Sequence, residues 1–243
     1  MFCYTTRMAK QREKRLTPSN LTYSKDWKFV WWATAGCGSR SIERFLVQIG
    51  VSDLRDDEAP IQNGSSWSHR QGIPEGCEDF PVICNSRNPY TRLLSSWKDI
   101  LVEQEENISD GAVKGHSKMS FESYLAKKER FYPPEELHYE KEWAQIGVKP
   151  SYKLRMEHLV EDIYNVEPFM KAEKDKIERY INAYIMNNVH ANENRYDEYI
   201  KSPNGVLVQD CKPHYTQELA DMVYEEFKLV FDFFGYEKDS WLL

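Results

Sequence analysis

Long hydrophobic runs are absent from this chain of 243 residues. The longest nearly apolar run, residues 29–37, has about half of the roughly 20 residues that a membrane-spanning helix needs. The basic residues near the N-terminus are followed by no apolar stretch of the kind that a secretory signal contains. We therefore expect a soluble, cytoplasmic protein that has no membrane partner.

Cysteine pairs and excess positive charge are also missing. The five cysteines form no CxxC pair, and their odd number argues against a disulfide scaffold and against a zinc ribbon. The formal net charge is −7, which argues against general binding to nucleic acid through neutralisation of phosphates. Any anion site must therefore concentrate positive charge locally, in a pocket.

The overall composition is that of a globular protein. Hydrophobic residues make up 41% of the chain and charged residues 29%, unlike the composition of disordered segments. The length suits one domain of ordinary enzyme size. We interpret residues 1–26, which are polar and basic, as an N-terminal arm and residues 27–243 as a single domain. The oligomeric state is not indicated.

A first strand, loop and helix are predicted near the start of the domain. Residues 28–33 form a short apolar run rich in β-forming residues, and the small residues of 34–39 are typical of a tight loop. Apolar residues from Ile42 to Ile49 then recur at helical spacing, and Gly50 supplies a C-terminal stop.

A second unit of the same kind begins at the predicted strand 80–84. Asn88 is a good helix N-cap, and Pro89 suits the first helical position because its missing N–H costs nothing there. A further strand over 152–156 and a C-terminal helix over 219–234 follow. Alternating strands and helices predict an α/β fold with a central parallel sheet flanked by helices.

The loop after the first strand is rich in glycine and precedes a helix. Backbone N–H groups and the positive end of the helix dipole converge at such a loop, which can therefore hold a phosphate. The loop is not a Walker A loop, because the residues five positions after Gly36 and Gly38 are Ser41 and Glu43. Cys37 is not followed by the arginine of a cysteine-phosphatase loop, so we interpret it as a small loop residue.

The segment Arg87-Asn-Pro-Tyr-Thr-Arg-Leu-Leu-Ser95-Ser-Trp97 resembles the 3′-phosphate motif of the sulfotransferases. These enzymes use 3′-phosphoadenosine 5′-phosphosulfate (PAPS) as sulfuryl donor. The resemblance implies a P-loop-like sulfotransferase fold in which Arg87 and Ser95 hold the 3′-phosphate. Bidentate contact from arginine and a hydroxyl donor suit that anion.

Other segments are similar to the same family over roughly residues 28–236. The glycine-rich loop lies about 50 residues upstream of Arg87, where the family keeps its 5′-phosphosulfate loop. Residues 154–159 resemble the family segment Arg-Tyr-Glu-Asp-Leu, and residues 224–236 resemble its closing helix. His190-Ala-Asn192 with Tyr196 looks like the carbohydrate-sulfotransferase branch. The resemblance therefore favours a glycan hydroxyl as acceptor over a small phenol.

The resemblance also implies roles for the glycine-rich loop. Its residues would cradle the 5′-phosphosulfate: Gly36, Cys37, Gly38, Ser39, Arg40 and Ser41. The family usually has a lysine where Gly36 stands, and Arg40 is the nearest cationic substitute. Transfer to a hydroxyl or amine would leave 3′-phosphoadenosine 5′-phosphate (PAP), and no metal is required.

An acceptor hydroxyl must lose its proton during transfer, so a general base is expected. Family members place the base between the two phosphate motifs. In this chain the only histidine between them is His69. Glu58, Glu75, His116 and His138 are the rivals. Two other functions stay open: a P-loop-like nucleotide phosphotransferase, and a non-catalytic nucleotide-binding protein, suggested by the glycine at position 36.

Overall fold

The structure is a computed structural model, and it describes most of the predicted domain. The described residues are 20–34, 37–53, 55–56, 59–60, 73, 75–98, 119–126, 149–186, 199–201 and 206–242. None of the helices in these ranges is long and apolar enough to span a membrane.

The fold is α/β, with a mixed sheet at its centre. The four longer strands are β1 (Asn20–Ser24), β2 (Phe29–Ala33), β5 (Val82–Ser86) and β6 (Tyr152–Arg155). β2, β5 and β6 are parallel, as predicted, but β1 is antiparallel to β2. The predicted central parallel sheet is therefore confirmed for three strands, and the sheet as a whole is mixed because of β1. A connection as short as the one between β1 and β2 forms a hairpin, whereas parallel neighbours need a long crossover.

Two short strands extend the sheet beyond β1, and a separate ribbon lies elsewhere. The sheet order is β4-β3-β1-β2-β5-β6, with β3 at Arg55–Asp56 and β4 at Ala59–Pro60. β7 (Tyr199–Lys201) and β8 (Leu207–Gln209) pair antiparallel in a second sheet. Residues 20–24, which the sequence analysis assigns to the arm, form β1.

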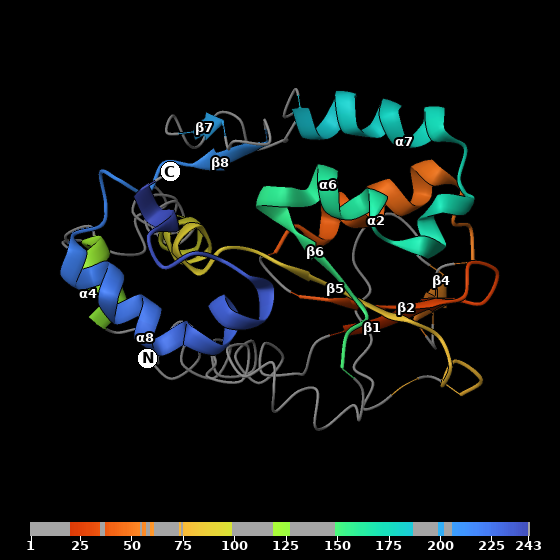
Figure 1. Cartoon of the computed structure of the whole chain (residues 1–243), viewed down its shortest axis with the longest axis horizontal. Coiled ribbons are helices and arrows are strands. Elements are labelled where there is room, and N and C mark those ends of the chain that lie inside the picture. The colour runs from red at the N-terminus through yellow and green to blue at the C-terminus, as the bar shows by residue number, and fades with distance from the viewer. Residues whose placement is uncertain are drawn as a thin grey trace, which may run out of the picture.

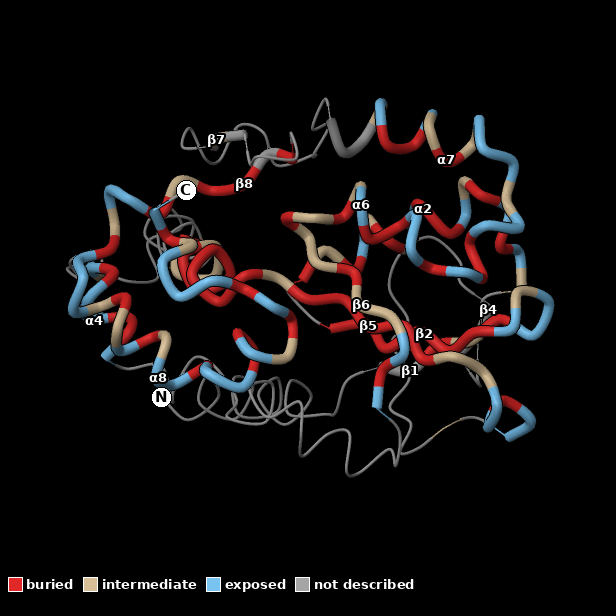
Figure 2. Tube along the Cα trace, viewed as in Figure 1, coloured by how far each residue is buried: buried red, intermediate tan, exposed pale blue. Residues whose placement is uncertain are grey.

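Both faces of the sheet are covered by hydrophobic clusters. Side chains alternate along each strand, so neighbouring residues enter different clusters. Val30, Trp32, Val82 and Cys84 enter one hydrophobic cluster, whereas Phe29, Trp31, Ile83 and Leu154 enter the other. Both tryptophans of β2 are buried, at 2% and 1% exposure, so neither presents its ring to solvent. Figure 2 shows β2 and β5 as buried segments at the centre of the molecule.

Helices supply the rest of both clusters. α2 (Ser39–Ile49), α6 (Leu159–Tyr164) and α7 (Lys174–Tyr180) gather on one side of the strands in Figure 1. The helix over residues 89–98, α4 (Phe121–Ala126) and α8 (Gln217–Phe234) form the other cluster. Short helical turns complete the fold: η3 (Met156–His158), η4 (Glu167–Lys171), η5 (Ile181–Met186) and η6 (Ser240–Leu242).

The local signals in the sequence place most helix ends correctly. α2 ends at Gly50 and α8 at Gly235, and both glycines have left-handed backbone angles. Asn88 caps its helix as predicted, because its Oδ1 accepts a hydrogen bond from the Tyr90 backbone at 3.0 Å. β5 starts two residues later than predicted, at Val82, because Phe80 N donates instead to Cys77 O in a turn.

Candidate functional site

Parallel pairing brings the two predicted phosphate motifs to the same edge of the sheet. β2 pairs with β5 in the register Val30↔Val82, Trp31↔Ile83 and Trp32↔Cys84. The loop after β2 and the segment after β5 therefore leave the sheet side by side. In open α/β sheets, ligands bind at this carboxyl edge.

Asn85 fastens these two segments together from inside β5. Its Oδ1 accepts hydrogen bonds from Thr34 N at 2.9 Å and Trp31 Nε1 at 3.2 Å. Its Nδ2 donates to Cys37 O at 2.7 Å and Thr34 O at 3.1 Å. The side chain is fully buried, so all four bonds form away from water. The glycine-rich loop is thus held at both ends by one amide.

The loop enters α2 through Gly38, which is the N-cap residue with φ +73°. Gly38 O accepts the backbone hydrogen bonds of Ser41 at 2.9 Å and Ile42 at 3.1 Å. A Cβ at Gly38 would overlap the end of the Met156 side chain. Glycine is required here both for its backbone angle and for the close approach of Met156.

The predicted loop ligands differ in exposure. Cys37 and Ser39 are buried, Ser41 is half-buried and Arg40 is exposed on the first turn of α2. No side chain caps this helix end. The backbone N–H groups that precede Ser41 at a helix start of this kind have no partner within the helix and point out of its end, where an anion is favoured. Gly36 and the predicted base, His69, lie outside the described residues.

Arg40 is the nearest described cation to that helix start in the sequence. It lies one turn from Glu43. Partial burial raises the pKa of Glu43, and the positive charges of Arg40 and Arg44 offset part of that increase. Because Arg40 is exposed, its side chain is solvated rather than fixed against the loop. Its assignment as the catalytic cation stays a prediction.

Arg87 follows directly after β5 and is held by two neutral oxygens. Its Nε donates to Thr91 Oγ1 at 3.2 Å and its Nη2 to Gln209 Oε1 at 3.4 Å. In the part of the chain that the structure describes, no carboxylate forms an ion pair with this guanidinium. Arg87 is therefore a half-buried cation at the sheet edge that has no direct carboxylate partner among these residues and reaches the Glu157 carboxylate only through Thr91.

Ser95 lies on the same face of its helix as Thr91, which contacts Arg87. Thr91, Ser95 and Lys98 occupy positions i, i+4 and i+7, so they form one stripe along the helix. Ser95 is half-buried and Lys98 is buried. The charges of both Arg87 and Lys98 act on the Cys211 thiol, which follows β8. The charges of Glu157 and Asp210 act on the same thiol in the opposite sense.

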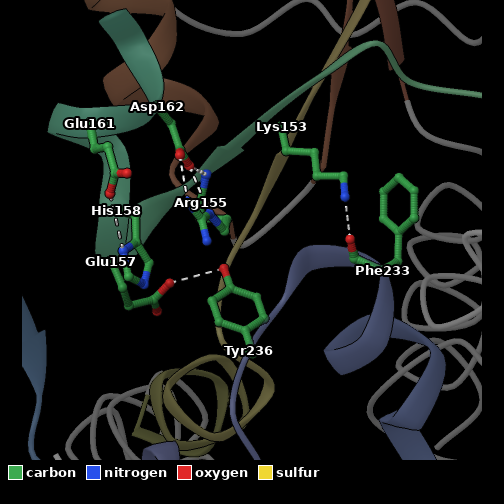
Figure 3. Close-up of polar contacts among 8 residues, drawn as sticks. All are labelled: Lys153, Arg155, Glu157, His158, Glu161, Asp162, Phe233 and Tyr236. Carbon is green, nitrogen blue, oxygen red and sulfur yellow. Dashed lines mark hydrogen bonds and ion pairs between the residues drawn. The ribbon is translucent and has the colours of Figure 1, made fainter. Parts of the chain in front are cut away.

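Glu157 is the buried carboxylate that organises the residues around Arg87. It accepts hydrogen bonds from Asn88 N at 3.1 Å, Thr91 Oγ1 at 2.8 Å and Tyr236 Oη at 3.0 Å. Figure 3 shows the Tyr236 hydroxyl directed at this carboxylate. Burial, and secondly the charge of Glu157, raises the pKa of Tyr236 well above its usual value. The Thr91 hydroxyl donates a hydrogen bond to Glu157, and its oxygen accepts one from Arg87.

The basic residues of β6 have partners of their own, as Figure 3 also shows. Arg155 forms a bidentate ion pair with Asp162, with Nη2–Oδ1 at 2.7 Å and Nε–Oδ2 at 3.0 Å. Lys153 donates to Phe233 O and lies 4.0 Å from the centroid of the Phe233 ring, and burial lowers its pKa. Lys153 and Arg155 line a cavity of about 350 Å³, and none of the predicted site residues is among its lining residues.

Sequence reasoning missed four residues of this site: Asn85, Thr91, Glu157 and Gln209. Asn85 did carry a signal, since it is a polar residue directly after the apolar run of residues 82–84. Gln209 lies 122 residues from Arg87, and nothing in the sequence pairs them. Among the described residues, no group of three or more His, Cys, Asp or Glu side chains is arranged to hold a metal ion.

No family model, curated protein or solved structure matches the chain in comparisons of its sequence and structure.

Proposed function

We propose that the protein is a PAPS-dependent sulfotransferase that sulfates a hydroxyl or amine of an acceptor, with a carbohydrate as the favoured acceptor. One observation carries the proposal: Arg87 is a half-buried arginine that forms no ion pair with any carboxylate among the described residues, at the sheet edge where the glycine-rich loop begins. Such a charge in a protein of net charge −7 suits a local anion site. The motif from Arg87 to Ser95 connects that anion with a nucleotide 3′-phosphate.

The described residues fit a ligand with two anionic groups. The start of α2 offers backbone donors to a 5′-phosphosulfate, and Arg87 with Ser95 offers donors to a 3′-phosphate. Thr34 Oγ1 is buried at the start of the glycine-rich loop and Gln209 Nε2 is buried beside Arg87, and neither atom has a hydrogen-bond partner in the described part of the chain. A polar ligand would supply partners of the kind that buried polar groups normally have.

When bound, PAPS supplies a sulfuryl group whose bond to phosphate breaks as its bond to the acceptor oxygen or nitrogen forms, which releases PAP. The chain's part is to bind and orient both partners and to take up the acceptor proton. His69 is the proposed base. We expect His69→Ala to lower turnover by about 10²–10⁴-fold without loss of PAP affinity, and unchanged turnover would exclude His69.

Calorimetric titration with PAP, without magnesium, tests the proposal directly, with AMP and ATP as controls. Binding that requires the 3′-phosphate supports it and justifies a screen of glycan acceptors with PAPS. Equal binding of AMP and PAP, or no binding, contradicts it. Magnesium-dependent ATP turnover would identify a phosphotransferase instead, and PAP binding without transfer to any acceptor would identify a nucleotide-binding protein.

A further inference from the structure

Gln209, the last residue of β8, is buried against Arg87 with half of its amide unused. It is 2% exposed, and its Oε1 accepts from Arg87 Nη2 over a long 3.4 Å. Its Nε2 is buried and has no hydrogen-bond partner within the described residues. The orientation of the amide is fixed by Arg87, because a guanidinium only donates and so must face the oxygen.

This arrangement is unfavourable for a residue with only a structural role. A buried N–H without an acceptor is unfavourable, and the long bond from Arg87 offsets little of that cost. Turning the amide over about its terminal bond would break only that long bond, because Nε2 has no partner to lose. The torsion concerned has a broad, roughly two-fold preference, so both orientations are accessible.

We propose that Gln209 is an additional ligand of the anion bound at Arg87, and that it binds by turning its amide over. The oxygen that now accepts from Arg87 gives way to the anion, and Nε2 then donates to that same anion. This inference rests on the proposed function for the identity of the anion as a nucleotide 3′-phosphate. The positive charge of Arg87, which has no direct carboxylate partner among the described residues, favours an anion there.

Two substitutions at Gln209 separate this role from simple support of Arg87. Gln209→Leu removes the donor, and we expect PAP binding to weaken by about 10- to 100-fold, the scale of a hydrogen bond to a charged group. Gln209→Glu places a carboxylate on Arg87 that cannot donate, so we expect weaker binding still. Gln217→Leu and Gln217→Glu are matched controls, since Gln217 is exposed on α8 and contacts Asp221 instead.

Nuclear magnetic resonance of the unmodified protein keeps the test independent of how the variants fold. The side-chain NH₂ signals of Gln209, assigned by their loss in a Gln209 variant, should shift on addition of PAP and less on addition of AMP. Circular dichroism checks the fold of each variant.

The outcomes distinguish this inference from the proposed function. If the unmodified protein binds PAP but Gln209→Leu binds equally well, or the amide signals do not move, the Gln209 inference is wrong and the proposed function stands. If PAP does not bind, the proposed function fails. Titration with inorganic phosphate then decides: an Arg87-dependent shift of the Gln209 amide would retain the anion site, and its absence would overturn both.

Discussion

Arg155 and Asp162 neutralise each other at the end of β6, with Nη2 and Oδ1 at 2.7 Å. Arg87, at the end of the adjacent parallel strand β5, has only Thr91 and Gln209 as partners among the described residues. Of two arginines at neighbouring strand ends, Arg155 thus has a direct carboxylate partner, whereas Arg87 reaches the Glu157 carboxylate only through Thr91. The anion affinity of this sheet edge is expected at Arg87 and not at Arg155.

Arg87→Ala should therefore weaken PAP binding by about 1.5–3 kcal/mol, the value for hydrogen bonds to a charged group. AMP lacks the 3′-phosphate, so its affinity should change little. Calorimetry on the variant and on Arg179→Ala, an exposed arginine of α7, measures both effects at equal net charge. A PAP dissociation constant that is the same in both variants would remove Arg87 from the site.

Gly38→Ala should lower the free energy of unfolding more than Gly235→Ala does. Both glycines have φ +73°, so both substitutions cost about 1–2 kcal/mol from the left-handed backbone. At Gly38 the new methyl group also requires the flexible end of the Met156 side chain to shift, which adds a smaller further cost, whereas no atom lies within 4 Å at Gly235.

Urea unfolding of both variants gives the difference between the two glycines. Adding Met156→Ala to Gly38→Ala should remove much of the additional cost, because the two sites then no longer overlap. Equal destabilisation at Gly38 and Gly235 would show that Met156 adjusts freely.

Glu157→Ala should destabilise the fold by about 2 kcal/mol or more, because it leaves buried donors on Asn88, Thr91 and Tyr236 without an acceptor. For a chain of this size the melting temperature should fall by about 4–8 °C. Glu161→Ala is the control, since Glu161 is 62% exposed and its contact with His158 is at the surface. Similar melting temperatures for the two variants would contradict the role of Glu157.

Stability should decrease in alkaline solution because of buried thiols. Burial raises the pKa of Cys211 from 9.0 to about 12, so the unfolded chain loses this proton first. The contribution of Cys211 to the free energy of unfolding is therefore fully present below pH 9.0 and is lost as the pH rises toward about 12. Between these two pH values the free energy of unfolding falls by about 1.4 kcal/mol per pH unit because of this one proton. Denaturant unfolding between pH 8 and pH 11, in the protein and in Cys211→Ala, should show a shallower decline in the variant; identical slopes would refute this assignment.

The sequence allowed the α/β class and the two strand–loop–helix units to be predicted because their signals are local. Helical spacing and Gly50 define α2, and Asn88 with Pro89 defines the start of the next helix. β1 was missed because its residues are mostly polar and continue a polar, basic segment. Its antiparallel pairing is set by contact with β2, which the strand pattern alone does not reveal.

The site was predictable only in part, for the same reason. Arg87 and Ser95 share a short motif, so sequence alone suggested them. Glu157 and Gln209 act on Arg87 through contacts between elements far apart in the chain. Their importance arises from packing, which places a buried acceptor under Thr91 and an amide against the guanidinium.

Asn85 bears on how the proposed site would distinguish nucleotides. One buried side chain holds Thr34 and Cys37 against β5, two residues before Arg87 in the chain. If the glycine-rich loop and Arg87 bind the two anionic groups of PAPS, they form a bivalent receptor with a rigid spacer, in which the first contact sets the effective concentration for the second. A positional isomer with its second phosphate on the 2′ oxygen would lose one contact entirely, because a fixed spacer cannot share the misfit between its two ends.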